Sequence, residues 1–490
     1  MVQFILNDQD INTSLPPGTT VLDFVRYHKD LKGTKIGCRE GDCGACTILV
    51  GELIGNDIRY RSMMSCLMPL ANADGKHIVT IEGINPNDGS LTPVQQAMVD
   101  ENGTQCGFCT PGFVMSLTGF CLGITGGSAE AAVSSIDGNI CRCTGYKSIE
   151  RAANVLSSAF RRQNHSLLDA IDKQVIPEYF SSIPRRLKVL EAQAQAPPKG
   201  GTQNAFVGGG TDVYVQKPEQ MAENSATHLF YDDELRAIRD TGEYVEIGAS
   251  VTVTDLLESP VMQQIFPDLY KHLKLVSSTP IRNMATLAGN FVNASPIGDM
   301  TVWFLALNAE IDLTTGQVGD LTGVRTILLR DLYQGYKQLA KSEDEFITKI
   351  RFRKPAGDFR FNFEKVCKRT YLDIATVNTA ISLTVSPTEP DDGPPPPKFI
   401  ESEIETPQFV IESAHVAAGG VAPVPLYLKE TSNFLAGKPA TLRTVREANE
   451  IMQSEISPIS DVRGTADYKR LLLHQLFRAN FHEILGLSAI

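Results

Sequence analysis

Cysteine is distributed unevenly along this chain of 490 residues, and its distribution constrains the fold more than any other feature. Nine of the ten cysteines lie between Cys38 and Cys143. Eight of these nine form two groups with different spacings: first Cys38, Cys43, Cys46 and Cys66, and then Cys106, Cys109, Cys141 and Cys143. Four thiols that recur at short spacing are typical of a metal centre, so each group predicts a small domain built around one.

The first group has the spacing C-x4-C-x2-C, with a fourth cysteine after nineteen further residues. This is the plant-type pattern for a 2Fe–2S cluster. Three glycines, Gly37, Gly41 and Gly44, let the backbone adopt positive φ and bring amide donors close to the cluster sulfurs. A zinc site is the alternative, because Cys-x2-Cys also begins many zinc-binding motifs. Residues 1–7 contain no apolar signal segment, so we expect a reduced, cytoplasmic protein without disulfides.

Short strands and one helix are expected around this loop. Residues 2–6, 47–50 and 78–81 read as strands, and Thr20 can cap a helix that begins at Val21. Strands, helix, ligand loop and strand follow one another as in a β-grasp ferredoxin. The ligand loop, C-R-E-G-D-C-G-A-C, resembles the ferredoxin domain of molybdenum hydroxylases.

The second group lies beside segments that read as helices. Thr92-Pro93 and Thr110-Pro111 each place a capping side chain before a proline at the first helical position, and Gly123 is a plausible stop. Two further helices are expected over residues 128–135 and 146–161. The sequences G-T-Q-C-G-F-C-T-P-G-F and I-C-R-C-T-G-Y are similar to the helical 2Fe–2S domain of the xanthine oxidase family. Cys121 and Cys367 remain outside both groups, and we expect them to be packing residues.

Composition excludes several classes of function. A net charge of -12 argues against nucleic-acid binding and against association with anionic lipid. No apolar run approaches the roughly 18 residues needed to cross a bilayer, and the run at 302–307 is core material. The length predicts three or four domains.

The middle of the chain contains a glycine loop, F-V-G-G-G-T-D at residues 206–212, which differs from the Rossmann pattern G-x-G-x-x-G. Its glycines could admit a pyrophosphate or could form a simple turn. Two later segments, residues 280–290 and 294–299, together with this loop resemble the FAD domain of molybdenum hydroxylases. A further segment, residues 363–375, resembles the family's F-x-K-x-x-R stretch ending in D-I-A.

The resemblance implies that these segments hold FAD. The residues it indicates are Phe206, Val207, Gly208, Gly209, Gly210, Thr211, Asp212, Val213, Thr286, Gly289, Asn290, Ser295, Asp299 and Lys365. Two of them have alternative interpretations: Asp299 could cap the following helix, and Lys365 could be a solvated strand lysine rather than a positive charge near reduced flavin. The chain departs from the family at Ala288, where a glycine is usual, and at Val276, in a stretch where some relatives place an aromatic residue against the flavin.

We therefore expect an α+β multidomain chain. The expected domains are a β-grasp 2Fe–2S ferredoxin domain (1–85), a four-helix 2Fe–2S domain (86–165), a linker (166–184), an α+β FAD-binding domain of the vanillyl-alcohol oxidase/PCMH type (185–350) and an α+β domain like the C-terminal domain of CO dehydrogenase flavoproteins (351–490). Residues 194–201 are expected to be a surface loop and residues 387–397 an exposed proline-rich insertion.

The resemblance implies electron transport within the xanthine dehydrogenase branch of the family. A molybdopterin-binding large subunit, in a heterotetramer of two small and two large chains, would hydroxylate hypoxanthine or xanthine. Electrons would then pass through the helical-domain cluster and the ferredoxin-type cluster to FAD and NAD+. By the same resemblance, Gln105 and the Cys143 loop would face the partner's pterin. The alternatives are another molybdenum hydroxylase, acting on an aldehyde or N-heterocycle, and a binding protein that kept the fold without cofactors.

Overall fold

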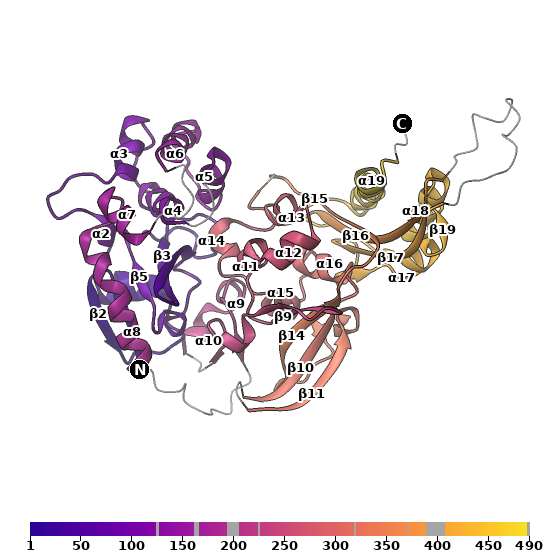
Figure 1. Cartoon of the computed structure of the whole chain (residues 1–490), viewed down its shortest axis with the longest axis horizontal. Coiled ribbons are helices and arrows are strands. Elements are labelled where there is room, and N and C mark those ends of the chain that lie inside the picture. Colours follow the sequence, from indigo (N-terminus) through magenta and orange to yellow (C-terminus); the bar gives the residue numbers. More distant parts are fainter. Residues whose placement is uncertain are drawn as a thin grey trace, which may run out of the picture. The chain divides into compact units, whose positions relative to one another are not determined.

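A computed structural model describes residues 1–123, 127–160, 166–193, 205–223, 226–317, 320–369, 371–388 and 407–487 (Figure 1). The chain divides into two compact units, and each is described by itself. The first unit comprises residues 1–232, 252–255 and 277–286, and the second comprises residues 233–251, 256–276 and 287–490. The expected surface loop at 194–201 lies wholly outside the described residues, as does the expected insertion beyond residue 388.

The first unit begins with a five-stranded sheet in the order β2-β1-β5-β3-β4. Only β1 and β5 pair in parallel. Its strands are β1 (Val2–Leu6), β2 (Gln9–Thr13), β3 (Thr47–Ile54), β4 (Asp57–Met64) and β5 (His77–Val79). The three strands predicted from the sequence are confirmed, but the last ends at Val79 because Ile81–Ile84 forms the short helix α2.

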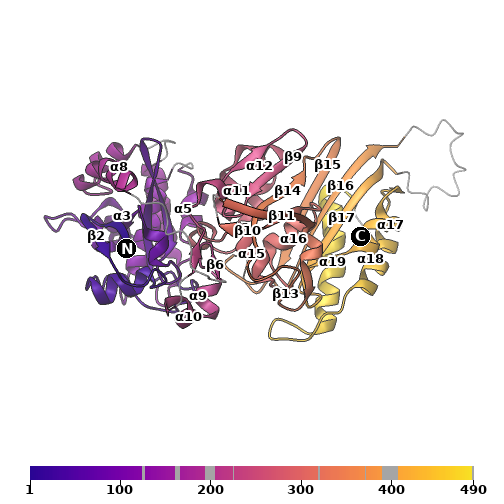
Figure 2. The same ribbon diagram turned by 90° about the horizontal axis from the view of Figure 1, so that it is seen from below.

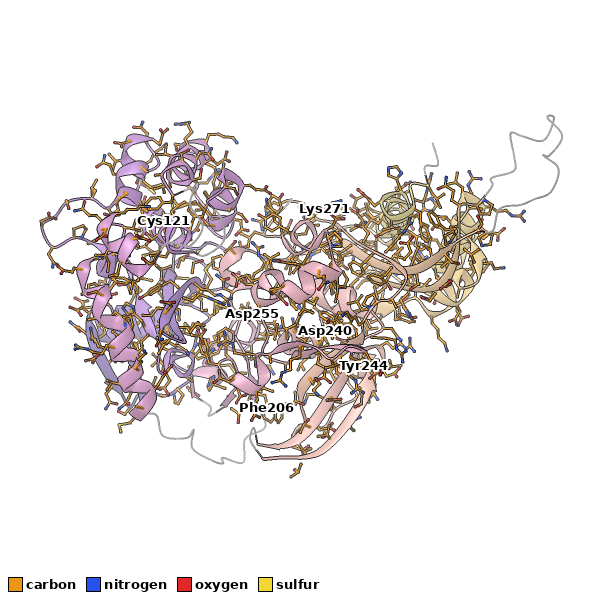
Figure 3. The ribbon with its side chains drawn as sticks, viewed as in Figure 1. Cys121, Phe206, Asp240, Tyr244, Asp255 and Lys271 are labelled. Atoms are coloured by element: carbon orange, nitrogen blue, oxygen red, sulfur yellow. The ribbon has the colours of Figure 1, made fainter. Side chains whose placement is uncertain are left out.

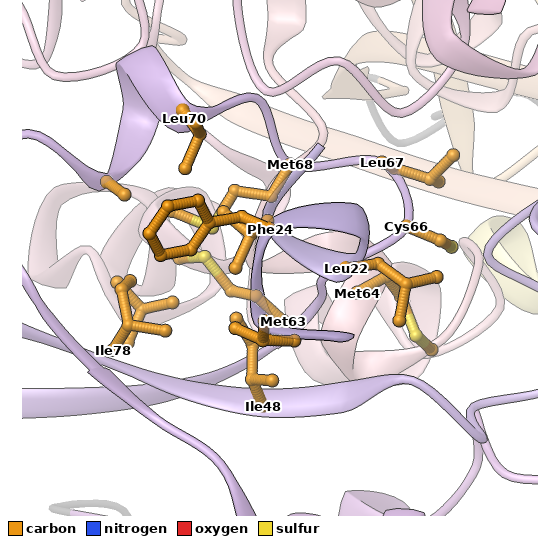
Figure 4. Close-up of a cluster of buried hydrophobic side chains, with 14 of the residues drawn as sticks. Leu22, Phe24, Ile48, Met63, Met64, Cys66, Leu67, Met68, Leu70 and Ile78 are labelled. Carbon is orange, nitrogen blue, oxygen red and sulfur yellow. The ribbon is translucent and has the colours of Figure 1, made fainter. Parts of the chain in front are cut away.

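The core of this sheet forms one buried apolar cluster (Figure 4). Leu22 and Phe24 pack there on Ile48, Met64 and neighbouring side chains. They lie on a helical segment made of α1 (Val21–Asp23) and a following π-helix (Phe24–His28). Thr20 caps this segment as predicted, because its hydroxyl accepts a hydrogen bond from the Asp23 amide.

Four helices follow and share a second apolar core. They are α3 (Pro93–Asp100), α4 (Thr110–Leu122), α5 (Ala129–Ser135) and α6 (Lys147–Ala159). Thr92 forms a complete capping box with Gln95. The predicted cap at Thr110 is wrong by one residue: Cys109 is the N-cap, and the Thr110 hydroxyl is instead 2.7 Å from the hydroxyl of Thr104.

Short elements complete the first unit. Helix α8 packs on β1 and β3, and β6 pairs in parallel with β7. The elements are η2 (Leu70–Ala73), α7 (Leu167–Asp172), η3 (Glu178–Ser182), α8 (Ile183–Gln193), β6 (Phe206–Val207), α9 (Val213–Gln216), α10 (Pro218–Glu223), β7 (Thr227–His228) and α14 (Thr279–Arg282). Helix α11 (Val253–Glu258) begins in this unit and ends in the second.

The second unit contains two larger sheets. An antiparallel sheet has the order β11-β10-β14-β9-β8, and another has the order β15-β16-β17-β18, with β19 beside β17. Its strands are β8 (Ile238–Asp240), β9 (Tyr244–Gly248), β10 (Glu310–Gln317), β11 (Asp320–Leu328), β12 (Tyr333–Gly335), β13 (Gln338–Leu339), β14 (Phe346–Arg353), β15 (Asp358–Val366), β16 (Val377–Pro387), β17 (Phe409–Gly419), β18 (Leu426–Tyr427) and β19 (Lys438–Pro439).

Helices α17, α18 and α19 share the core of the second sheet (Figure 2). The helices of this unit are η4 (Asp233–Leu235), α12 (Pro260–Ile265), α13 (Leu269–Leu273), α15 (Leu287–Asn293), α16 (Asp299–Leu305), η5 (Leu329–Leu332), α17 (Lys429–Leu435), α18 (Leu442–Glu455) and α19 (Ala466–Leu485). The apolar run at 302–307 is buried in α16 and the turn after it, as predicted. Across the described ranges of the chain, none of the helices combines the length and apolarity needed to cross a membrane.

Candidate iron–sulfur and flavin sites

The first cysteine loop, residues 37–46, leads into β3 and directs backbone amides at its sulfurs. The amides of Glu40 and Cys43 both donate to Cys38 Sγ at 3.3 Å, and the amide of Cys38 donates to Cys43 Sγ at 3.4 Å. Gly41 and Gly44 adopt φ of 74° and 70°, the region that glycine enters without steric cost. The predicted approach of amide donors to the thiols is therefore confirmed.

The thiols of the first cysteine group stand in two pairs, Cys38 with Cys43 and Cys46 with Cys66, each joined by a side-chain hydrogen bond. The bond from Cys43 lowers the pKa of Cys38 to about 5 against the opposing effect of burial, and the same bond raises the pKa of Cys43. The bond between Cys46 and Cys66 likewise lowers the pKa of Cys46 and raises that of Cys66.

The second cysteine group shows the same arrangement on a helical frame. Cys109 pairs with Cys141, and Cys106 pairs with Cys143. Burial acts to raise the pKa of Cys141, but hydrogen bonds from the Thr144 hydroxyl at 3.1 Å and the Thr144 amide at 3.4 Å outweigh it and lower that pKa. Burial raises the pKa of Cys109 to about 12.

Two pairs of thiols fit a cluster of two iron ions, because each iron of a four-cysteine 2Fe–2S cluster takes two thiolates. Within the described segments, no group of three or more His, Cys, Asp or Glu side chains is arranged to hold a metal ion. The thiols of both groups are arranged in pairs rather than around a single metal ion. When bound, such a cluster supplies one-electron chemistry.

The two cysteines outside the quartets have packing surroundings. Cys121 is buried in the core shared by α3 to α6 (Figure 3), and burial raises its pKa. Cys367 is half-buried after β15, and its thiol donates to the carbonyl of Arg369. The prediction that both thiols are packing residues is confirmed for Cys121 and agrees with the partial burial of Cys367.

The two cysteine loops contact each other directly within the first unit. The Ile140 amide, next to Cys141, donates to the carbonyl of Cys43 at 2.9 Å. Beside it, the Asn139 side-chain amide donates to the carbonyl of Gly44 at 3.1 Å. Sequence reasoning missed this contact, although Asn139 lies only two residues before a predicted ligand.

Part of the predicted flavin site lies in the first unit, where the glycine loop after β6 (Figure 3) packs on residues 284–286. A Cβ added to Gly208 would stand 2.6 Å from Thr286 Oγ1, and one added to Gly209 would stand 1.8 Å from the Met284 carbonyl oxygen. Gly210 adopts φ of 83°, and an added Cβ would stand 2.5 Å from the Leu67 carbonyl oxygen. The structure therefore brings the predicted pyrophosphate loop and Thr286 together, and a side chain at either of its first two glycines would separate them.

The remaining predicted flavin residues lie in the second unit, around α15 and α16. Lys365 Nζ is 2.7 Å from Asp299 Oδ2 and also donates to the Leu275 carbonyl at 2.8 Å. Asn378, which sequence reasoning missed, donates to Asp299 Oδ1 at 2.6 Å. The Lys365 and Asp299 side chains are only 1% and 12% exposed, so a buried ion pair joins two residues that were predicted separately.

Two alternative interpretations from the sequence are wrong. Lys365 is not a solvated strand lysine, because it is buried in the ion pair just described. Asp299 is not the cap of α16: Gly298 is the N-cap, and the Asp299 carboxylate bonds to Lys365 and Asn378 instead of the helix amides. Asn290 is also engaged, because its Oδ1 accepts hydrogen bonds from the amide and the hydroxyl of Thr301.

The segment 277–286 interacts with both iron–sulfur domains, which sequence reasoning did not anticipate. Arg282 forms an ion pair with Asp137 at 2.8 Å, with side chains 5% and 7% exposed, and Thr279 donates its amide to the same carboxylate. Asn283 donates to the carbonyl of Ser62 on β4 at 2.8 Å. Part of the motif assigned to flavin therefore serves to fasten this segment to the iron–sulfur domains.

Four family models match the chain in succession. They are the 2Fe-2S iron-sulfur cluster binding domain (residues 4–71), the 2Fe-2S binding domain (80–154), the FAD binding domain in molybdopterin dehydrogenase (181–355) and the CO dehydrogenase flavoprotein C-terminal domain (363–484). These domains define the class of the chain: it is an iron–sulfur flavoprotein with two 2Fe–2S clusters and FAD as its cofactors.

The chain is similar to xanthine dehydrogenases along nearly its whole length. It is 29% identical to xanthine dehydrogenase of Emericella nidulans, over 99% of this chain and 39% of the relative, and 29% identical to that of Blastobotrys adeninivorans, over 96% and 39%. A solved CO dehydrogenase from Oligotropha carboxidovorans matches 58% of this chain and 91% of its own, with 25% identity and a TM-score of 0.48. The chain thus spans about two fifths of the length of the curated relatives it matches.

The family models show that the chain combines two 2Fe-2S domains with an FAD binding domain and a CO dehydrogenase flavoprotein C-terminal domain. In this combination of domains it is similar to the xanthine dehydrogenases that it matches. The multidomain α+β fold expected from the sequence is confirmed.

Proposed function

We propose that this chain is the electron-carrying subunit of a xanthine dehydrogenase. It takes electrons from a molybdopterin-binding large subunit that hydroxylates hypoxanthine or xanthine, and it delivers them through its two clusters and FAD to NAD+. The observation that carries the proposal is the direct contact of the two cysteine loops, where the Ile140 amide meets the Cys43 carbonyl at 2.9 Å. Electron transport requires carriers that are held at a short and fixed separation. This hydrogen bond holds the two cysteine loops together in that way.

The proposal assigns the cofactors to named residues. The first cluster is held by Cys38, Cys43, Cys46 and Cys66, and the second by Cys106, Cys109, Cys141 and Cys143. FAD is held by residues 206–213 with Thr286, Gly289, Asn290, Ser295, Asp299 and Lys365. The thiol pairing supports the first assignment, and the packing of Gly208 on Thr286 together with the Asp299–Lys365 ion pair supports the second. The proposed domains are residues 1–85, 86–165, 185–350 and 351–490, with a linker at 166–184.

The partner and the acceptor are part of the same proposal. We assign the molybdenum chemistry to a separate large subunit, with two of each chain forming a heterotetramer; the similarity to relatives named xanthine dehydrogenase supports this assignment. NAD+ as acceptor and a cytoplasmic location belong to the same proposal. Two electrons collected on a flavin one at a time can leave together as hydride, which is the form that NAD+ accepts.

Co-purification of the chain with its large subunit tests this function. We expect about four irons and one FAD for each small chain, and xanthine-dependent reduction of NAD+ by the complex. Turnover with an aldehyde or another N-heterocycle, but not with xanthine, would contradict the purine assignment. Turnover of xanthine with oxygen alone as acceptor would contradict the NAD+ assignment. An iron-free and flavin-free chain purified anaerobically would leave only a binding role.

A further inference from the structure

Asn139 lies at the junction of the two cysteine loops, where both the nitrogen and the oxygen of its side-chain amide form hydrogen bonds. It is 5% exposed. Its amide nitrogen donates to the Gly44 carbonyl at 3.1 Å and to Thr47 Oγ1 at 3.4 Å, while its oxygen accepts from Ser116 Oγ at 2.7 Å. One side chain therefore joins the first cysteine loop, the start of β3 and helix α4.

The backbone next to Asn139 connects a ligand of one quartet to a ligand of the other. The Ile140 amide bonds to the Cys43 carbonyl, and Ile140 is covalently bonded to Cys141. Only one hydrogen bond, of 2.9 Å, interrupts the covalent path between these two cysteines. Asn139, one residue earlier, bonds to Gly44, the residue that follows Cys43.

The backbone segments at this junction approach one another more closely than they could if Gly44 and Gly112 carried side chains. A Cβ added to Gly44 would stand 2.3 Å from the Gly138 carbonyl oxygen and 2.4 Å from Asn139 Nδ2. A Cβ added to Gly112 on α4 would stand 2.3 Å from the Gly44 carbonyl oxygen. Contacts under 3 Å force the chain to move, so glycine at both positions permits the approach that Asn139 then stabilises.

We propose that Asn139 is a positioning residue that holds the two cluster-binding loops at the separation on which electron exchange between them depends. The inference rests on the proposed function, because it gives Asn139 a role only in a chain that carries two clusters. Its hydrogen bonds to Gly44 and Ser116 keep the Ile140 amide against Cys43. The exchange itself moves one electron, which oxidises one centre and reduces the other, and no bond or proton changes place.

The test uses Asn139→Asp in the full chain, because this variant keeps the shape and the acceptor for Ser116 but loses the donor to Gly44. We expect four irons to remain, the splitting from spin–spin interaction between the two reduced clusters to shrink in the electron paramagnetic resonance spectrum, and the rate of electron exchange after flash reduction to fall at least about tenfold. Ser116→Ala, which only releases the Asn139 oxygen, should give a smaller change in the same direction.

Asn7→Ala is the matched control. Asn7 also bridges two segments of the ferredoxin sheet: its Oδ1 accepts from the Thr80 amide at 2.9 Å, and its Nδ2 donates to the Thr80 hydroxyl at 3.1 Å. We expect the spin–spin splitting of the Asn7→Ala chain to equal that of the unmodified chain. An Asn139→Asp chain with both clusters and unchanged splitting and rate would overturn the inference, and so would loss of a whole cluster, which would mean a role in assembly. Absence of clusters from the unmodified chain would contradict the proposed function instead.

Discussion

The two groups of four cysteines differ in the exposure of their thiols. In the first group, Cys46 and Cys66 are buried at 3% and 4% exposure against the core of the ferredoxin sheet. In the second group, Cys106 and Cys143 are exposed at the end of a helical domain. Under the proposed function, the buried thiols Cys46 and Cys66 belong to the centre that exchanges electrons inside the chain, and the exposed thiols Cys106 and Cys143 belong to the centre that a partner approaches. Each of the following predictions tests that comparison.

Loss of one ligand from each loop should have the largest effect. We expect Cys143→Ser to lose one cluster and to abolish transfer from substrate to FAD, while reduction of FAD by NADH continues, because the exposed centre would receive electrons from the partner. Cys66→Ser removes a buried ligand and should additionally destabilise the ferredoxin sheet. Iron content, thermal unfolding and stopped-flow reduction of FAD measure these effects. Failure of NADH to reduce FAD in Cys143→Ser would show that the assigned electron order is wrong.

The second cysteine group should depend on a buried ion pair close to Cys141, although Cys106 and Cys143 are exposed. Asp137 lies four residues before Cys141 and is paired with Arg282 in a buried environment. Arg282→Ala leaves that carboxylate without its cation, so we expect a loss of about 3–5 kcal/mol in the free energy of unfolding. Arg443→Ala, which breaks an exposed pair with Glu447, should cost only about 0–1 kcal/mol. Urea unfolding compares the two variants, and equal costs would refute the anchoring role.

Two glycines offer a matched comparison of how tightly the loops are packed. Gly44 and Gly107 adopt φ of 70° and 80°, so alanine is strained at either position. An added Cβ at Gly44 meets the Gly138 carbonyl, whereas one at Gly107 meets nothing within 4 Å. We therefore expect Gly44→Ala to lower the free energy of unfolding by about 1–3 kcal/mol more than Gly107→Ala does. Urea unfolding at equal iron content measures both variants. A larger loss of the free energy of unfolding in Gly107→Ala than in Gly44→Ala would contradict this prediction.

Acid should weaken the sheet that carries the first loop before it weakens the helical domain. Burial lowers the pKa of His77 on β5 to about 3, and residues 86–160 contain no histidine. Unfolded histidine titrates near 6.5, so between about pH 6.5 and 3 the unfolded state binds the extra proton. The contribution of His77 to the free energy of unfolding is fully present above pH 6.5. It falls by about 1.4 kcal/mol for each pH unit below that value. Hydrogen exchange of β5 and α4 at pH 7 and 5 measures this, with His77→Gln expected to reduce the slope.

Sequence reasoning succeeded where the determinants are local. The strand at Val2–Leu6 and the caps at Thr20 and Thr92 depend on neighbouring residues, and all three were predicted correctly. It failed at Thr110, because the contact of that hydroxyl with Thr104 depends on how the preceding loop folds back. Lys365 shows the same limit, since its burial requires Asp299, which lies 66 residues earlier in the chain.

The sequence by itself determined which cofactors the chain is built for, because ligand spacing and glycine placement within short loops are properties of adjacent residues. Only the tertiary structure decided which thiol pairs with which and how the cysteine loops meet through Asn139 and Ile140. It also decided that Arg282 serves Asp137 rather than a cofactor. The contacts made by Asn139, Ile140 and Arg282 join residues about 95 to 145 positions apart, and their formation depends on the packing of whole domains, which no local pattern encodes.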